Sequence, residues 1–342
     1  MNNGNRFNPD QTTFPKLLQA CGYQTALFGK WHLGNNVEFN PTKQGFDEFR
    51  GNSGGNVDYH SRIDGALIED WWKNLEMVPE EGYTTDLITK HGVDFIERHK
   101  DGPFCLYLAH LAVHSPYQGR NDPTLRLPSG KRGKYRRKPK DFIRAYKEMI
   151  EVMDARIGQI VETVKKLGLE RKTFIFFCSD NGPVGDDGYK DEALEKMGDH
   201  KPAGPYSGGK YSVLEGGTRT PFITYWPGTI KPGVSDEMVC TIDLATSLAN
   251  HLKVSMPKDA CLDSLDVMNA LLGKKGAKGR AHLVQQDNGR GNNYGYRVGN
   301  WKLQRHDSKR KRNVVVTDKL ANTPAPRYAL FDLSKDVQEK KN

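Results

Sequence analysis

The chain has 342 residues, of which 36% are hydrophobic and 27% charged, a composition typical of a globular protein and not of a disordered one. This length allows one large domain, or a large domain with a small one. No run of 18 or more apolar residues occurs, so we expect no membrane-spanning helix. The N-terminal "MNNGNRFNPDQTTF" also lacks the apolar segment of a signal peptide.

The net charge of +9 is concentrated in two basic clusters, at residues 131–140 and 305–312. Such clusters are either solvated loops or sites of attraction for a polyanion. Nucleic acid is a poor candidate, because the clusters lack interleaved aromatic residues and no nucleic-acid-binding motif is present. A sulfated or carboxylated polysaccharide fits the charge as well.

The five cysteines indicate neither a zinc site nor a disulfide framework, because their number is odd and no C-x-x-C occurs. Cys105 and Cys178 lie inside apolar runs, which is typical of small core residues.

Helix-periodic segments alternate with continuous apolar runs along the first 250 residues. In chain order we expect a short helix, a strand, a helix, a strand, a long helix, two strands and a short helix, at residues 13–22, 23–31, 84–100, 103–114, 141–169, 172–182, 220–228 and 243–252. The long helix is the clearest, because its apolar side chains recur every three or four residues and Gly168 ends it.

This alternation predicts an α/β fold with a mostly parallel sheet covered by helices on both faces. After about residue 280 the pattern changes to short strands without long helices, "HLVQQ", "YGYRVGN", "WKLQRH" and "YALFDL". These predict a small antiparallel subdomain. We therefore expect an α/β domain over residues 1–275 and a C-terminal antiparallel subdomain over 276–342.

The stretch "TALFGKWHLGN" ends an apolar strand with Lys30 and His32. Residues two apart in an extended chain point to the same face, so these two side chains are expected together, with Trp31 packed on the other face. The alternative is a strand end that runs into solvent, where a lysine and a histidine have no function.

A second buried run, "FIFFCSDNGP", ends with Asp180 and Asn181. Ligand sites of open α/β sheets lie beyond the carboxyl ends of the strands. Carboxylate and amide oxygens suit a hard cation such as Ca²⁺ or Mg²⁺. The alternative is an ordinary Asn-Gly turn.

Two further stretches carry candidate residues of the same kind. "AHLAVHSPY" ends a strand with His110 and His114, of which one is expected at the carboxyl edge of the sheet. "YSGGKYSVLEGG" places Lys210 after two glycines, which allow close backbone approach. A lysine on such a loop is a candidate for binding an anion, although glycine-rich loops are common.

In this order, G-K-W-H, H-x-P, S-D-N-G and G-K-x-x-x-x-E-G-G-x-R-x-P-F-I-x-x-W-P-G, the motifs resemble the sulfatase family, of the arylsulfatase type in the alkaline phosphatase-like superfamily. The resemblance covers nearly the whole chain. It implies that Lys30 and Lys210 hold the sulfate oxygens and that His32 assists the nucleophile. It also implies that His114 contacts the ester and helps the leaving group to depart.

The resemblance further implies that Asp180 and Asn181 complete a calcium site, and that the nucleophile is a formylglycine made from a cysteine or serine in a C/S-x-P/A-x-R motif. No cysteine or serine of this chain has that context. The family's paired aspartates are also absent, since Asp186-Asp187 follows no apolar strand. In the family both features precede the segment that begins at Thr13.

We therefore expect an N-terminally truncated sulfatase that lacks its first strand and does not hydrolyse substrate alone. Loss of a central strand exposes ladder edges and favours aggregation, and the remaining calcium site should bind the ion poorly. The complete protein is expected in the periplasm or outside the cell, acting on a sulfated carbohydrate. The alternatives are a non-catalytic remnant that binds sulfated glycans, and a phosphodiesterase of the superfamily, which the G-K-W-H motif disfavours.

Overall fold

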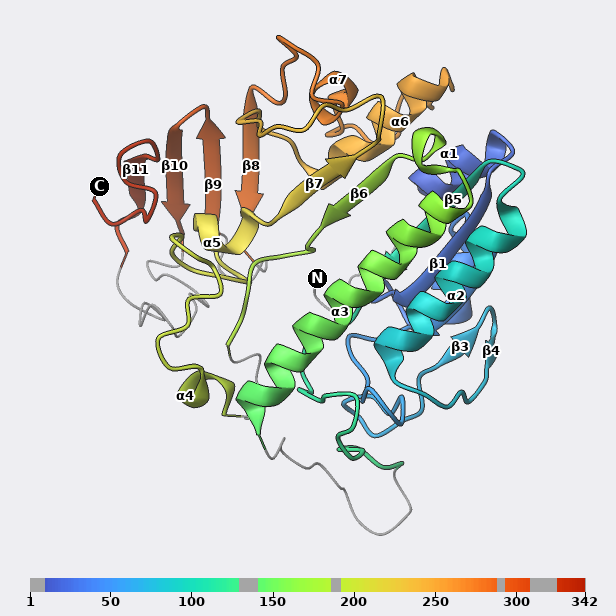
Figure 1. The fold of residues 1–342 in the computed structure, drawn as a ribbon. Coiled ribbons are helices and arrows are strands. Elements are labelled where there is room, and N and C mark those ends of the chain that lie inside the picture. The colour runs from blue at the N-terminus through green and yellow to red at the C-terminus, as the bar shows by residue number, and fades with distance from the viewer. Residues whose placement is uncertain (1–9, 129–140, 186–191, 288–292, 308–324, 342) are drawn as a thin grey trace. The chain divides into compact units, whose positions relative to one another are not determined.

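The computed structural model describes residues 10–128, 141–185, 192–287, 293–307 and 325–341 (Figure 1). The chain divides into two compact units, a first formed by residues 3–173 with 242–266 and a second formed by residues 174–241 with 267–342. The predicted boundary near residue 276 stays a prediction. Basic residues 131–140, most of the 305–312 cluster, and Asp186-Asp187 lie outside the described residues.

The first unit holds a five-stranded sheet in the order β4 (Glu76–Met77), β3 (Trp72–Lys73), β2 (Glu48–Asn52), β1 (Gln24–Lys30), β5 (Phe104–Ala109). Strand β1 is parallel to both β2 and β5, whereas β3 and β4 join antiparallel. The sheet is therefore mixed, with the expected parallel strands at its centre. Strand β5 is its apolar edge within the described chain.

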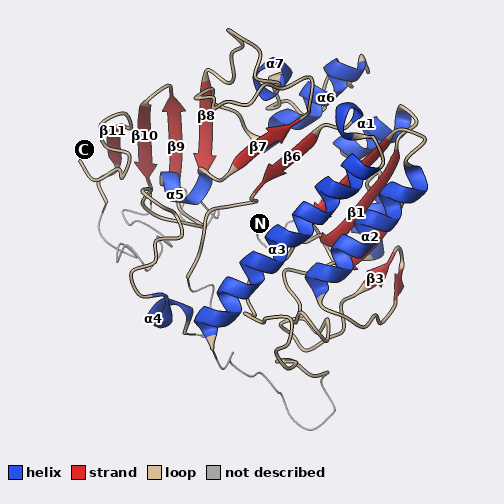
Figure 2. Ribbon diagram, in the orientation of Figure 1, coloured by secondary structure: helices blue, strands red, loops and turns tan. Residues whose placement is uncertain are grey.

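Helices cover both faces of this sheet, as predicted, because β1 is apolar on both sides (Figure 2). Leu27 joins a core cluster with Phe46 and Phe49, against which α1 (Phe14–Ala20) places Phe14. The next residue, Phe28, points to the opposite face and meets Phe95 of α2 (Thr84–His99), with ring centroids 6.0 Å apart.

The long predicted helix is confirmed as α3 (Phe142–Lys166), which packs on α2. The Asp141 side chain accepts a hydrogen bond from Arg144 N at 3.0 Å and caps its first turn, and Gly168 follows its last turn in the left-handed region. Helix α6 (Leu244–Leu252) packs on α1. Short 3₁₀ turns complete the described chain at Val37–Phe39, Pro41–Lys43, Glu170–Lys172 and Thr241–Asp243.

The second unit holds two antiparallel sheets. Strand β6 (Ile175–Cys178) pairs with β7 (Phe222–Tyr225), and the C-terminal strands form a sheet in the order β11 (Tyr328–Asp332), β10 (Trp301–His306), β9 (Asn293–Val298), β8 (His282–Gln286). The four-stranded sheet confirms the predicted antiparallel C-terminal strands. Helices α4 (Ala193–Met197), α5 (Glu215–Thr218) and α7 (Met268–Leu271) are short.

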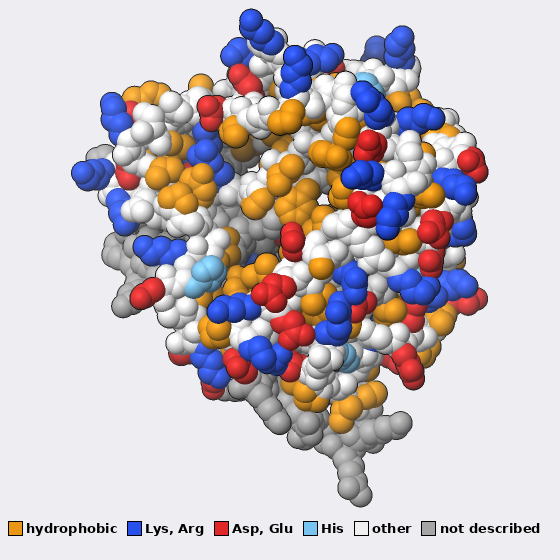
Figure 3. Space-filling model, in the orientation of Figure 1, with side chains coloured by type: hydrophobic (Ala, Val, Ile, Leu, Met, Phe, Trp, Pro, Cys, Tyr) orange, Lys and Arg blue, Asp and Glu red, His pale blue; other side chains and the backbone are white. Residues whose placement is uncertain are grey.

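Strand β10 of the four-stranded sheet buries its polar side chains and exposes its apolar ones. Lys302 and Gln304 of β10 are completely buried, whereas Trp301 and Leu303 are 54% and 39% exposed. Apolar side chains accordingly gather on the visible surface over this sheet (Figure 3). The buried face must therefore hold a polar network, because an unpaired buried charge is strongly unfavourable.

Among the described residues, no helix combines the length and the apolar character needed to cross a bilayer.

Candidate active site

Lys30 is the last residue of β1. The segment after it is held by hydrogen bonds to the end of β2 and to the turn at Val37–Phe39. Trp31 N donates to Asn52 O at 2.9 Å, and the indole Nε1 of Trp31 donates to Phe39 O at 2.7 Å. The Trp31 ring packs edge-on against Phe46 of the core. Trp31 therefore lies on the packed face, as predicted.

His32 does not continue the strand alternation on which its predicted position rested. Its φ is +58°, so the backbone turns into the left-handed region directly after β1, while its N–H donates to Ser53 O at 3.0 Å. The imidazole lies against Gly55, where an added Cβ would come within 2.9 Å of Nε2. Gly55 therefore leaves the space that this ring occupies.

His114 follows β5, the strand parallel to β1, and its position is set by three contacts. Its N–H donates to Leu111 O at 2.7 Å, its carbonyl oxygen accepts from the Tyr59 hydroxyl at 3.0 Å, and its Nδ1 lies 2.8 Å from Ser115 O. A carbonyl oxygen only accepts, so Nδ1 carries a proton. A second proton on Nε2 would make this side chain a general acid.

Segment 53–59 connects the two candidate histidines, since Ser53 bonds the backbone of His32 and Tyr59 bonds that of His114. Within it, the fully buried Asp58 carboxylate collects five hydrogen bonds. Oδ1 accepts from the backbone N–H groups of His60 and Ser61; Oδ2 accepts from Gln118 Nε2 and from the N–H groups of Leu125 and Arg126. Asp58 therefore fixes the loop that follows His114.

We expect Asp58→Asn to lower the free energy of unfolding by about 2 kcal/mol, because the new amide must face donors with a donor. Urea denaturation of the purified chain measures the change. Asp94→Asn, on the exposed face of α2, is the matched control and should shift stability by less than about 0.5 kcal/mol. Equal losses in both variants would contradict the role assigned to Asp58.

His110, the other histidine of "AHLAVHSPY", is partly buried, and both of its ring nitrogens are buried without a hydrogen-bond partner among the described residues. Burial lowers the pKa of this imidazole to about 4. His110 is therefore neutral at physiological pH.

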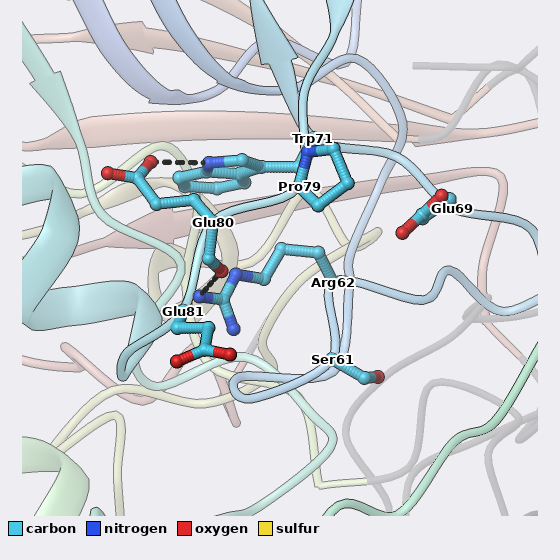
Figure 4. Close-up of a pocket in the computed structure, with 7 residues that line it drawn as sticks. All are labelled: Ser61, Arg62, Glu69, Trp71, Pro79, Glu80 and Glu81. Carbon is cyan, nitrogen blue, oxygen red and sulfur yellow. Dashed lines mark hydrogen bonds between the residues drawn. The ribbon is translucent and has the colours of Figure 1, made fainter.

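A cavity of about 310 Å³ in the first unit contains none of the predicted site residues (Figure 4). Its wall holds the buried Arg62, whose guanidinium lies 5.7 Å from the Trp71 ring, and Glu80, which accepts from Trp71 Nε1 at 2.9 Å. Burial alone would raise the pKa of Glu80. Hydrogen bonds from His91 and Trp71 and the nearby charges of His91 and Arg50 outweigh it and lower this pKa to about 2. Glu80 is thus a structural anion.

In the second unit, β6 ends at Cys178, and Asp180 and Asn181 follow as predicted. Asp180 is exposed. The Asn181 Nδ2 donates to Gly182 O at 2.9 Å, which identifies Oδ1 as the side-chain atom that can serve as a ligand.

These two residues offer two oxygen ligands, whereas Ca²⁺ takes roughly six to eight. Over the described ranges, no group of three or more His, Cys, Asp or Glu side chains is placed to hold a metal ion. Asp180 and Asn181 therefore do not form a calcium site by themselves.

Lys210 lies next to the segment that follows β6, because its backbone N–H donates to Pro183 O at 2.9 Å. Its Nζ lies 4.9 Å from the centroid of the Tyr211 ring. The structure thus brings Lys210 and the Asp180–Asn181 strand end together within one unit. Lys30, His32 and His114 lie in the other unit, at the carboxyl ends of adjacent strands.

The Glu215-Gly216-Gly217 turn, which begins α5, joins these segments through backbone contacts. Gly216 N donates to Ser207 O at 2.8 Å, and Gly182 N donates to Gly217 O at 2.9 Å. A Cβ on Gly182 would lie 1.8 Å from Gly216 O. The approach is therefore possible only with glycine at residue 182.

We expect Gly182→Ala to destabilise the protein by about 2 kcal/mol, since its methyl group would separate the strand end from the turn. Gly158→Ala is the control. It lies inside α3 with open space around it, so it should instead stabilise by about 0.5–1 kcal/mol. Thermal unfolding of both variants measures the contrast, and the same sign for both would contradict it.

Sequence reasoning did not identify the polar network that holds this turn. Glu215 is completely buried, and its carboxylate meets Lys302 Nζ at 2.9 Å and Arg297 Nη1 at 3.1 Å. Lys302 also pairs with Glu339 at 2.9 Å, and the second oxygen of Glu339 accepts from Glu215 N at 2.6 Å. Gln304 Nε2 donates to Glu339 at 2.6 Å.

Burial opposes the charge on both carboxylates of this network with different outcomes. For Glu215 burial would raise the pKa, but the charges of Lys302 and Arg297 outweigh it and lower the pKa. For Glu339 burial is the larger effect, and its pKa is raised. No local sequence motif predicts this network, because its members come from three segments that lie far apart in the sequence.

We compared the chain with protein-family models, with curated proteins and with solved structures. The family model described as Sulfatase matches residues 1–254. An N-acetylgalactosamine-6-O-sulfatase of Bacteroides thetaiotaomicron is 32% identical over 96% of this chain and 73% of that protein. The N-acetylgalactosamine-6-sulfatase of Homo sapiens is 32% identical over 77% of this chain and 49% of that protein. The chain thus spans about half the length of the animal relatives it matches.

Solved structures agree with these matches. One, from work on the metabolism of multiple glycosaminoglycans by Bacteroides thetaiotaomicron, has a TM-score of 0.77 and 29% identity over 98% of this chain and 78% of that chain. Another, of Ps i-CgsB in complex with k-i-k-neocarrahexaose, has a TM-score of 0.74 and 25% identity, over 99% and 72% of the two chains. They confirm the expected alkaline phosphatase-like α/β fold with a separate antiparallel sheet.

Proposed function

Because the chain belongs to the sulfatase family, we propose that it supplies the sulfate-binding groups of a sulfuric ester hydrolase that acts on a sulfated carbohydrate. The observation that carries the proposal is the junction at the Glu215-Gly216-Gly217 turn. It holds a lysine-bearing loop against the strand end with Asp180 and Asn181. A lysine on a loop that is hydrogen bonded to a strand end with two oxygen-bearing side chains suits an anionic group bound together with a metal ion.

Each predicted residue has a role in this proposal. Lys30 and Lys210 bind the sulfate oxygens and stabilise the negative charge that redistributes over them as the S–O bond breaks. His114 protonates the leaving alcohol oxygen from Nε2, because its Nδ1 is held by Ser115 O. His32 assists the nucleophile. Asp180 and Asn181 are two ligands of a Ca²⁺ ion in the complete protein, where the ion would polarise the sulfate.

The proposed nucleophile is a formylglycine of the complete protein, and none of the five cysteines in the sequence replaces it. Burial raises the pKa of Cys105 to about 12 and also raises that of Cys178, so neither forms a thiolate readily. We therefore propose that this chain alone binds sulfate esters without hydrolysing them. A periplasmic or secreted location belongs to the same proposal, because polysaccharide substrates lie outside the cytoplasm.

The proposed substrate is a sulfated glycosaminoglycan or a related polysaccharide. Relatives named N-acetylgalactosamine-6-sulfatase and a neighbour bound to a carrageenan oligosaccharide support this class. The absence of a C/S-x-P/A-x-R motif favours a second candidate, a non-catalytic protein that binds sulfated glycans.

Calorimetric titration with a chondroitin 6-sulfate disaccharide tests the proposal. We expect Lys30→Ala and Lys210→Ala each to weaken binding at least tenfold, since each removes one cation from the sulfate. Lys90→Ala, a 63% exposed lysine of α2, should leave the affinity unchanged. Release of sulfate by this chain would contradict the need for a formylglycine, and absence of binding would contradict the proposal itself.

A further inference from the structure

A second cavity, of about 440 Å³, lies within the second unit, and none of the predicted site residues lines it. Its wall includes Tyr206, Arg219, Asp236, Arg297 and Asn300. The cavity falls in the size range of sites for small ligands. Tyr206 precedes Lys210 on the same loop, and Arg219 follows α5 directly.

The two arginines of this cavity are held in place by the buried Glu215. Arg297 Nη1 and Arg219 Nη1 lie 3.1 Å and 3.5 Å from the same oxygen of Glu215, and Arg297 Nε donates to Gly299 O at 3.0 Å. Glu215 is itself fixed by Lys302. A guanidinium has five N–H donors, so these contacts use only part of each group. The remaining donors are oriented before any ligand arrives.

The other side chains of the wall suit the hydroxyl groups and the apolar face of a sugar ring. Asp236 accepts hydrogen bonds, Asn300 both donates and accepts, and Tyr206 adds an aromatic wall with Arg219 4.9 Å from its centroid. Adjacent hydroxyls of a pyranose need this mixture of donors and acceptors.

The charge of the cavity argues against a second sulfate. Three cations, Arg219, Arg297 and Lys302, face two buried carboxylates, and Asp236 balances the remaining charge. A fully charged sulfate would gain little here, whereas a sugar with hydroxyl groups would use both the donors and the acceptors.

We propose that this cavity is a subsite for an unsulfated sugar unit of the glycan. It is distinct from the cations that bind the sulfate. The inference rests on the proposed function for the identity of the glycan and extends it, because it makes affinity depend on sugar units that carry no sulfate.

The test compares unsulfated chondroitin tetrasaccharide with the chondroitin 6-sulfate disaccharide. We expect Tyr206→Ala and Asn300→Ala each to weaken tetrasaccharide binding about tenfold and to leave disaccharide binding unchanged. Asn300 contributes to the fold through its backbone oxygen, which accepts from Leu333 N and is kept in Asn300→Ala. Tyr206→Ala removes the ring beside Arg219 and leaves the Lys302 and Arg297 contacts of Glu215 in place. Unchanged melting temperatures confirm folding.

The outcomes separate the two proposals. Lys210→Ala should weaken binding of the sulfated disaccharide and leave binding of the unsulfated tetrasaccharide unchanged. Tetrasaccharide binding that both cavity variants weaken supports the subsite even if the disaccharide does not bind. A wild-type chain that does not bind the tetrasaccharide, or variants that bind it as well as wild type, would overturn the subsite whatever the disaccharide shows.

Discussion

Replacing Lys302 by methionine is expected to lower the free energy of unfolding by about 3–5 kcal/mol, the cost of removing one partner from a buried ion network. Lys302 is completely buried, and its ammonium group lies 2.9 Å from both Glu215 and Glu339. Methionine fills similar volume without charge, so both carboxylates lose the cation that they share. Arg297 and Arg219 still reach Glu215, but no other cation is placed against Glu339 among the described contacts.

Chemical denaturation with a double-mutant cycle measures this effect. Lys302→Met combined with Glu339→Gln should be less unstable than the sum of the single variants, because the double variant buries one charge fewer. The control is Lys335→Met, an 82% exposed lysine 3.2 Å from Asp332, for which we expect a change below about 1 kcal/mol. Similar losses for Lys302→Met and Lys335→Met would show that the network does not support the fold.

The same network should position Lys210, since Glu215 begins the turn on which the lysine loop is hydrogen bonded. Glu339 contacts the start of this turn, because its side chain accepts a hydrogen bond from Glu215 N. If Lys210 binds sulfate as proposed, a variant that disrupts the buried polar side chains of the four-stranded sheet should weaken sulfate binding as well as the fold.

The regular elements that buried apolar side chains create could be predicted from sequence. Helix α3 follows from its period, and β1 and β5 follow from continuous apolar runs. Strands β2, β3 and β4 could not, because residues 48–77 contain no such run and these strands form by successive pairing, β2 with β1, β3 with β2 and β4 with β3. The antiparallel pairing of β6 with β7 could not be predicted either, because strand pairing depends on tertiary contacts and not on the local sequence of each strand.

For β10 the alternation in "WKLQRH" is correct as a strand signal, but the usual assignment of its faces fails. The apolar residues Trp301 and Leu303 are exposed, and the polar residues Lys302 and Gln304 are buried. The reason is Glu215, since only polar side chains can compensate a carboxylate on that face. Glu215 lies about ninety residues earlier in the chain, so no local pattern contains this information.

The positions of some candidate residues could likewise be predicted from the sequence, and those of others could not. The motifs correctly placed Lys30, Asp180 and Lys210 at strand ends or on the glycine loop. The alternation argument for His32 fails, because the chain turns left-handed after Trp31. "AHLAVHSPY" left two histidines open, and only the structure distinguishes His110, whose ring nitrogens are buried without a partner among the described residues, from His114, whose Nδ1 contacts Ser115 O and whose backbone accepts from Tyr59.

His110 should make the fold sensitive to mild acid. Its pKa is lowered from 6.5 to about 4 because burial disfavours the charged imidazole. Below pH 6.5 the unfolded chain takes up a proton that the folded chain refuses, so stability falls as the pH drops from 6.5 toward 4. A shift of this size corresponds to a loss of about 3 kcal/mol over the whole window.

We expect His110→Phe to abolish most of this loss, because phenylalanine is similar in size and takes up no proton. Urea denaturation at a series of pH values from 7 to about 4.5 measures it, since most carboxylates remain charged over that range. His282→Phe, at an exposed position of β8, is the control and should retain the wild-type pH dependence. Wild type and His110→Phe with parallel profiles would mean that His110 is hydrated or paired in solution.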